Sequence, residues 1–259
     1  MSTAISTTEK TTGKMIDYPA LDQNSEQAQV IASNLDGEPM MEKDLVKVPT
    51  PLGGSTTWNI DIDGNVESTD EIVGLLVAVA NRGELWPSLT PTGSRPVIIS
   101  HDLITGYRVS DDIGSEIDPD DLEKYRIGDR RYDWPALSTS DEFGFGSKGA
   151  GRRVKESQLL AILRQGEVWP LLVKIGPGSL GDWTPFRKRL PCFRWQAVIG
   201  LRLAKAKGAS GNPYSQVVPR LVGKISKEQG QVAHKTYTVP LEEMLRRQPL
   251  GAAVTVDRE

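Results

Sequence analysis

Hydrophobic and polar positions alternate along several short segments of the chain, as they do in half-buried β-strands. Trp58, Ile60 and Ile62 alternate with polar residues, and Asp63-Gly64 then offers a hairpin turn. Residues 71–82 form a continuous apolar run whose length and β-branched content favour a buried strand, although the pattern also allows a helix.

The second half of the chain shows longer segments of the same kind. Strands are predicted for residues 167–175, 193–207 and 214–225, and a strand or short helix for residues 157–163. Between them, residues 180–189 predict a short amphipathic helix. Residues 239–248 predict a last helix, begun at Pro240.

These elements predict a mainly β (α+β) fold, an OB-like small β-barrel with long loops and one or two short helices. Residues 1–45, rich in Ser, Thr, Glu and Gln, are expected to form a flexible N-terminal arm. The OB-like domain is expected over residues 46–238, with an acidic and Gly-rich insertion at about 105–155. A C-terminal helix and tail would occupy residues 239–259.

Charge is divided unevenly along the chain. Residues 1–150 have 12 Lys and Arg against 26 Asp and Glu, whereas residues 151–250 have 18 against 6, within a chain whose net charge is only −3. The basic part also contains Trp169, Trp183, Phe186, Phe193, Trp195 and Tyr214. Cations follow phosphates and rings stack on unpaired bases, so this composition favours single-stranded nucleic acid, while an ordinary wet basic surface remains the alternative.

The single cysteine, Cys192, excludes an internal disulfide and a cysteine-based zinc site. We expect it to be a buried packing residue. The sequence predicts no membrane span, no cofactor and a cytoplasmic setting, in the host cell if a phage encodes the protein.

Candidate phosphate contacts are taken from the basic half of the chain. The expected set is Arg187, Lys188, Arg189, Arg194, Arg202, Lys205 and Lys207, joined by Lys148, Arg152 and Arg153 in the Gly-rich loop. For Arg202, Lys205 and Lys207, a solubilising hairpin end is an equal alternative. For the loop residues, contact with nucleic acid and plain disorder remain equal alternatives.

Candidate stacking residues are Trp183, Trp195, Tyr214 and Phe145. On a helix, Trp183 shares one face with Phe186 and Leu190, so a core role explains Trp183 better than base stacking does. Strand alternation likewise places Trp195 on the buried side.

Catalytic sites are poorly supported. The Gly-rich loop lacks the residue order of a phosphate-binding loop. The carboxylates between Asp111 and Glu123 do not follow the Ca²⁺-loop spacing, so we expect a solvated acidic segment. His101 and His234 are far apart in sequence and are expected to be structural.

Three segments, residues 166–180, 186–190 and 212–226, resemble proteins of bacteriophages and integrative elements that look like single-stranded-DNA-binding proteins. The resemblance covers roughly residues 45–230. Relatives of this type often have a Cys-x-x-Cys before the Phe-Gly loop, suggesting zinc. Here the comparable stretch is Pro135-Ala-Leu-Ser138, so no metal site is expected.

The sequence therefore predicts a non-catalytic single-stranded-DNA-binding protein of replication or recombination. Further candidate partners are replication or recombination enzymes and other copies of the same chain, in a homo-oligomer. The alternative is a protein-interaction factor, such as a virion component or an inhibitor of host defence, with no direct nucleic-acid binding.

Overall fold

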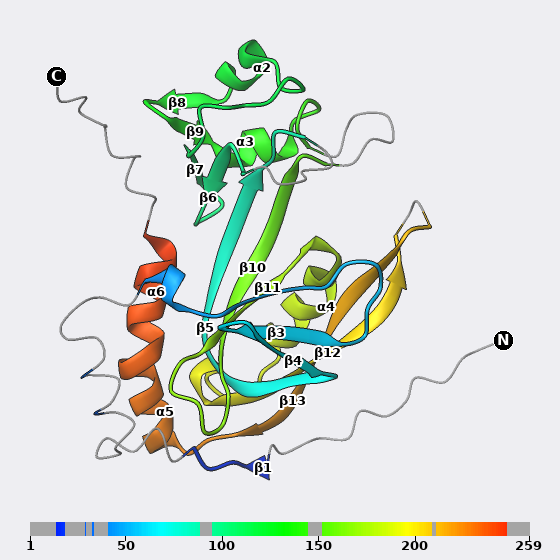
Figure 1. Cartoon of the computed structure of the whole chain (residues 1–259). Helices are drawn as coiled ribbons and strands as arrows, with labels where there is room; N and C mark the ends of the chain where they lie inside the picture. Colours follow the sequence, from blue (N-terminus) through cyan, green and yellow to red (C-terminus); the bar gives the residue numbers. More distant parts are fainter. Residues whose placement is uncertain are drawn as a thin grey trace.

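The computed structural model describes residues 14–18, 41–88, 95–144, 152–208 and 211–247, together with residues 29 and 33. Figure 1 shows long central strands with helices on both sides and a small unit beyond one end of them. The strands are β1 (Lys14–Met15), β2 (Lys47–Pro49), β3 (Trp58–Ile62), β4 (Asn65–Thr69), β5 (Glu71–Leu85), β6 (Ile98–Ser100), β7 (Thr105–Arg108), β8 (Arg126–Gly128), β9 (Arg131–Asp133), β10 (Val154–Leu163), β11 (Leu171–Ile175), β12 (Ala197–Lys207) and β13 (Pro213–Lys224). The α-helices are α2 (Pro119–Glu123), α3 (Trp134–Thr139), α4 (Pro177–Lys188), α5 (Lys227–Ala233) and α6 (Val239–Arg246), with 3-10 turns η2 (Glu42–Asp44) and η3 (Arg194–Gln196) and a π-helical turn η4 (His234–Thr238).

Strand β5 is the spine of the sheet. It pairs antiparallel with β12 over its first residues, with β10 along most of its length, and with β6 at its last three residues. Its side chains alternate between two cores: Leu75 and Val77 belong to one cluster, and Ile72 and Leu76 to the other. The apolar run of residues 71–82 is thus a buried strand, as predicted.

Helices cover both faces of this sheet. On one face, α5, η4 and α6 contribute Tyr237 and Leu241 to the core, and Figure 1 shows them stacked along one side of the long strands. On the other face, α4 buries Trp183, and the β3–β4 hairpin buries Trp58. The Trp58 indole nitrogen donates a hydrogen bond of 2.8 Å to the Leu201 carbonyl, which fixes the hairpin on the sheet.

The small unit consists of β6 to β9, α2 and α3 around a third cluster that includes Tyr132 and Trp134. The expected insertion at about 105–155 overlaps most of it. Pro119 begins α2, and the Asp118 side chain accepts a hydrogen bond from the Asp120 backbone nitrogen, which caps the first turn of this helix.

Over the described residues, the sheet contains eleven strands of mixed direction, and its pairings do not close into a barrel. The prediction of a mainly β fold with a few short helices is confirmed, while the OB-like barrel is not. The parallel pairs β1–β13 and β11–β2 are features that the strand pattern did not indicate.

Part of the expected N-terminal arm belongs to the folded body. Lys14 and Met15 pair with β13, and Tyr18 is 2% exposed in the core beneath the α5–α6 side. Leu45 is also buried there. Among the residues described, no helix is long and apolar enough to cross a membrane.

Candidate nucleic-acid interface

Helix α4 positions the first part of the site. Pro177 at its start has the fixed backbone angle that suits the first helical turn. Trp183 is fully buried, and its indole nitrogen donates to the Gln158 side-chain oxygen at 2.6 Å. Trp183 is therefore a core residue, as its place on the helix indicated, and it is removed from the stacking candidates: no face of its ring reaches solvent, and its polar atom already has a partner.

The chain then turns through η3 before β12 begins. The backbone nitrogen of Gln196 donates a hydrogen bond to the Phe193 carbonyl at 2.9 Å. The backbone nitrogen of Ile225 donates to the backbone carbonyl of Gln196, also at 2.9 Å. Gly230 of α5 lies so close that a Cβ there would overlap the Gln196 side chain. This short turn is thereby held against both β13 and α5.

Three rings form a column across this turn. Phe193 and Trp195 stack with centroids 5.0 Å apart and planes 3° apart, and Trp195 stacks on His234 at 4.2 Å and 18°. Trp195 is thus stacked on two rings of the protein itself and is only partly exposed, so its assignment as a base-stacking residue is corrected. The predicted strand alternation does not reach Trp195, because Arg194–Gln196 is a 3-10 turn.

Phe193 terminates the column on the solvent side and is 62% exposed. Phe193 also lines a hollow of about 600 Å³, together with Leu190, Pro191 and Cys192. A second hollow of about 510 Å³ shares Leu190 and Pro191 and continues to Phe186. We call the two hollows together the η3 groove.

Exposed cations border the η3 groove. Lys224 and Lys227 line its first hollow and Arg189 its second, and Lys188 precedes Arg189 at the end of α4. Within the described ranges, none of these four side chains forms an ion pair with a carboxylate. The sequence predicted Lys188 and Arg189 as phosphate contacts, but it did not indicate Lys224 and Lys227.

Arg194, by contrast, is held internally. Its guanidinium pairs with Glu242 of α6, which also binds Arg246 at 3.3 Å. Burial lowers the pKa of Arg194 from its ordinary value, Arg187 lowers it further, and Glu242 opposes both. Arg194 therefore anchors η3 to α6, and its side chain is not free for a phosphate.

Arg202 and Arg153 also have carboxylate partners. Arg202 lies 3.3 Å from Glu71, which holds Arg220 as well, and Arg153 lies 3.4 Å from Glu116. The hydrogen bond from Arg220 is the main reason that the pKa of Glu71 is lowered.

The predicted basic residues do not converge on one channel. Arg202 pairs in register with Glu71 at one end of β5, whereas Arg153 precedes Val154, which pairs with Leu85 at the other end. Fourteen steps of extended strand separate these ends by roughly 46 Å. Arg152 donates to the Ser138 carbonyl at 2.9 Å in the small unit.

The remaining candidates lie away from the η3 groove or outside the description. Lys205 and Lys207 are exposed at the far end of β12, roughly 30 Å of strand from Ala197. Tyr214 is half-buried, its ring against Gly178 at the start of α4. Phe145 and Lys148 lie outside the described residues.

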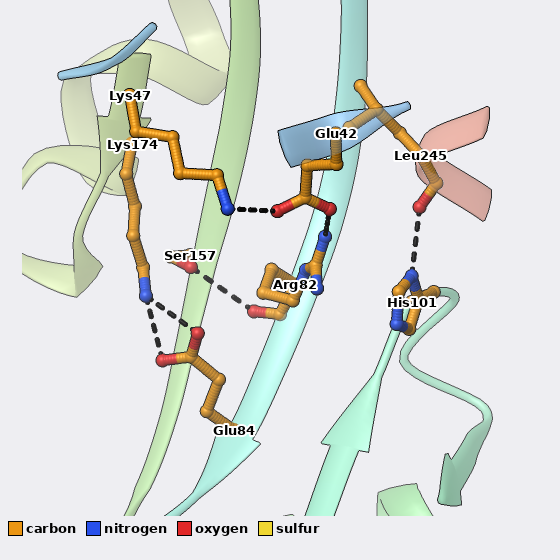
Figure 2. A network of polar contacts seen from close by, with 8 residues as sticks. All are labelled: Glu42, Lys47, Arg82, Glu84, His101, Ser157, Lys174 and Leu245. Atoms are coloured by element: carbon orange, nitrogen blue, oxygen red, sulfur yellow. Dashed lines mark hydrogen bonds and ion pairs between the residues drawn. The ribbon is translucent and has the colours of Figure 1, made fainter. Parts of the chain in front are cut away.

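Figure 2 shows a second group of charged residues, on the α6 side of β5. Glu42 lies between Arg82, at 2.7 Å, and Lys47, at 3.2 Å, while Lys174 binds both oxygens of Glu84 at 2.7 and 2.8 Å. Nearby, His101 Nδ1 donates to the Leu245 carbonyl at 2.9 Å. All three cations of this group are held by its two carboxylates, so we assign the group to fastening η2 and β11 onto β5.

Metal chemistry finds no support in the described part of the chain, where no three His, Cys, Asp or Glu side chains are placed to share an ion. Comparisons of the sequence and fold with models of protein families, with curated proteins and with solved structures found no match.

Proposed function

We propose that this protein binds single-stranded DNA without catalysis, through the η3 groove, during replication or recombination of a phage or mobile element. One observation supports the proposal above all. Exposed cations without carboxylate partners in the described ranges gather here: Lys224, Lys227 and Arg189 line the groove together with the exposed ring of Phe193, and Lys188 is next to Arg189 in the chain.

Phosphate neutralisation predicts how strongly the binding affinity should depend on salt concentration. Each phosphate contact to a single strand contributes about −0.7 to the slope of log affinity against log salt. Four contacts give a slope of roughly −3, which corresponds to a loss of about 50-fold in affinity between 50 and 200 mM salt. An apolar docking site lacks this dependence.

The test is an anisotropy titration of a labelled oligo-dT at several salt concentrations. The double variant Lys224→Gln/Lys227→Gln removes two cations at the groove and is expected to reduce the magnitude of the slope by about 1.4. Lys205→Gln/Lys207→Gln is the matched control, because it removes the same charge from exposed lysines at the far end of β12. It should leave the slope close to the wild-type value.

Two outcomes contradict the proposal: no binding of oligo-dT by the wild-type protein at about 50 mM salt, or equal losses in both double variants. The first of these favours a protein-interaction factor. That alternative draws its own support from Arg153, Arg194 and Arg202, whose charges are already matched by carboxylates. Indifference to single-stranded DNA, duplex DNA and RNA alike would favour it further.

A further inference from the structure

The column of Phe193, Trp195 and His234 has one open end. Trp195 stacks on both Phe193 and His234, and His234 lies in the turn between α5 and α6 with its Nδ1 buried. Only Phe193 combines a stacked inner face with high exposure, at 62%. A further flat ring can therefore be added to this column at a single position, on the outer face of Phe193.

The column is rigid before any ligand arrives. η3 is closed by its own hydrogen bond, joined to β13 through Ile225, packed on Gly230, and tied to α6 by the Arg194–Glu242 ion pair. A ring that is already fixed loses little conformational freedom when a partner stacks on it.

The surroundings define the chemistry of that ligand. Lys224 and Lys227 line the same hollow as Phe193, and they are exposed. A flat apolar face beside two ammonium groups matches a nucleobase with the phosphates that flank it. In a duplex, neighbouring base pairs already cover both faces of each base, so only an unpaired base can join the column.

We propose that Phe193 is the base-stacking residue of this protein and that it accepts one unpaired base as the fourth layer of the Phe193–Trp195–His234 column, with Lys224 and Lys227 on the adjoining phosphates. This inference rests on the proposed function and names the ring responsible for contact with bases. Arg194 is a positioning residue in this arrangement, since it fixes the turn through Glu242 and does not reach the ligand.

The experiment compares oligo-dT with an oligonucleotide of equal length that has abasic sites throughout. Both have the same phosphates, but only the first offers bases. Wild-type protein is expected to bind oligo-dT more tightly than the abasic strand by between about 5-fold and about 150-fold, the range that one base–aromatic stack supplies.

Three variants locate the effect. Phe193→Leu keeps an apolar side chain but removes the ring, so it should lower affinity for oligo-dT by that factor and leave affinity for the abasic strand and the salt slope unchanged. Phe193→Tyr keeps the ring and should retain wild-type discrimination. Tyr107→Leu, which removes a half-buried ring from β7 in the small unit, is the matched control and should change neither affinity.

The possible failures are distinct. If wild-type protein binds neither strand, the proposed function fails and this inference with it. If wild-type protein binds both strands equally, or if Phe193→Leu weakens both to the same extent, the cations can still hold DNA but the stacking assignment is overturned. The wild-type comparison and Phe193→Tyr remain informative if the leucine variant does not fold.

Discussion

Glu42 illustrates how one side chain supports a buried cation. Arg82 is only 7% exposed, and its sole ion-pair partner in the described ranges is Glu42. Burial alone would raise the pKa of the Glu42 carboxyl, but the charges and hydrogen bonds of Arg82 and Lys47 more than offset it, so this pKa is lowered. Removing one member of such a pair leaves the other charge uncompensated.

Glu42→Gln should reduce the free energy of unfolding at neutral pH by about 2 kcal/mol, less than for a fully buried pair because Glu42 keeps partial exposure. A carboxyl whose pKa is lowered by folding stabilises the protein above its ordinary pKa, about 4.3, and loses that contribution as the pH falls through the folded value. Urea unfolding at pH 7 and about pH 3 measures both effects. The difference between wild type and variant should shrink at the acid pH.

Glu243→Gln is the control for this prediction. Glu243 pairs with Arg247 one helical turn away, and both side chains are more than half exposed. Such pairs contribute only about 0.3–0.5 kcal/mol. An equal loss in the two variants would show that the Glu42–Arg82 pair is no stronger than a surface contact.

At the scale of elements, α3 packs against β5 where the Trp134 ring of α3 lies directly over Gly83 of β5. A Cβ at Gly83 would overlap the indole ring of Trp134, which is fully buried in the small unit. Gly181 in α4 has the opposite environment, with open space where its Cβ would lie. The same substitution should therefore have opposite effects at the two positions.

Gly83→Ala should destabilise the protein by about 1–3 kcal/mol, because Trp134 has no free volume into which it can move. Gly181→Ala should stabilise it by about 0.5–1 kcal/mol, because alanine favours the helix and meets no neighbour. Thermal and urea unfolding of the two variants provide the measurement. A stabilised Gly83→Ala protein would contradict the packing of α3 on β5.

Local patterns predicted those elements whose sequence shows its own period. The β3–β4 hairpin, the β5 run and α4 are found within a few residues of their predicted bounds. The η3 turn was not predicted, since three residues of 3-10 helix leave no period to detect. Strand alternation was therefore extended back through Trp195, and Phe193 was not recognised as the exposed ring.

Ion pairing was the other missing information. Arg194 is paired with a residue 48 positions away and Arg220 with one 149 positions away. Composition indicates that a region is basic, but it does not indicate which cations are matched by distant carboxylates. The unmatched lysines at 224 and 227 emerge only when the end of β13 is placed beside η3.

At the scale of the whole molecule, two tyrosines from opposite ends of the chain join the same core cluster. Tyr18 and Tyr237 are each at most 2% exposed, and burial raises the pKa of each phenol to about 12. Tyr237 also donates to the Val168 carbonyl at 2.9 Å. Both rings must remain neutral while the cluster is intact.

A raised phenol pKa stabilises the fold below the ordinary value of about 10, and this contribution is lost as the pH rises from there toward 12. We expect unfolding between about pH 10 and pH 12 in one cooperative step. Tyrosinate absorbance and circular dichroism should change together at that step. Two tyrosines that titrate near pH 10 in a still folded protein would contradict their burial.

The layout of β5 has a consequence during protein synthesis. Its longest partners, β10 and β12, begin roughly 70 and 110 residues after its end, while β6, the first to follow, covers only its last three residues. An apolar strand of 15 residues thus leaves the ribosome long before its edges can be paired. Late closure of distant strands is slow and leaves newly made chains prone to aggregate, so the yield of folded protein should depend on chaperones that shield β5 until residue 207 has emerged.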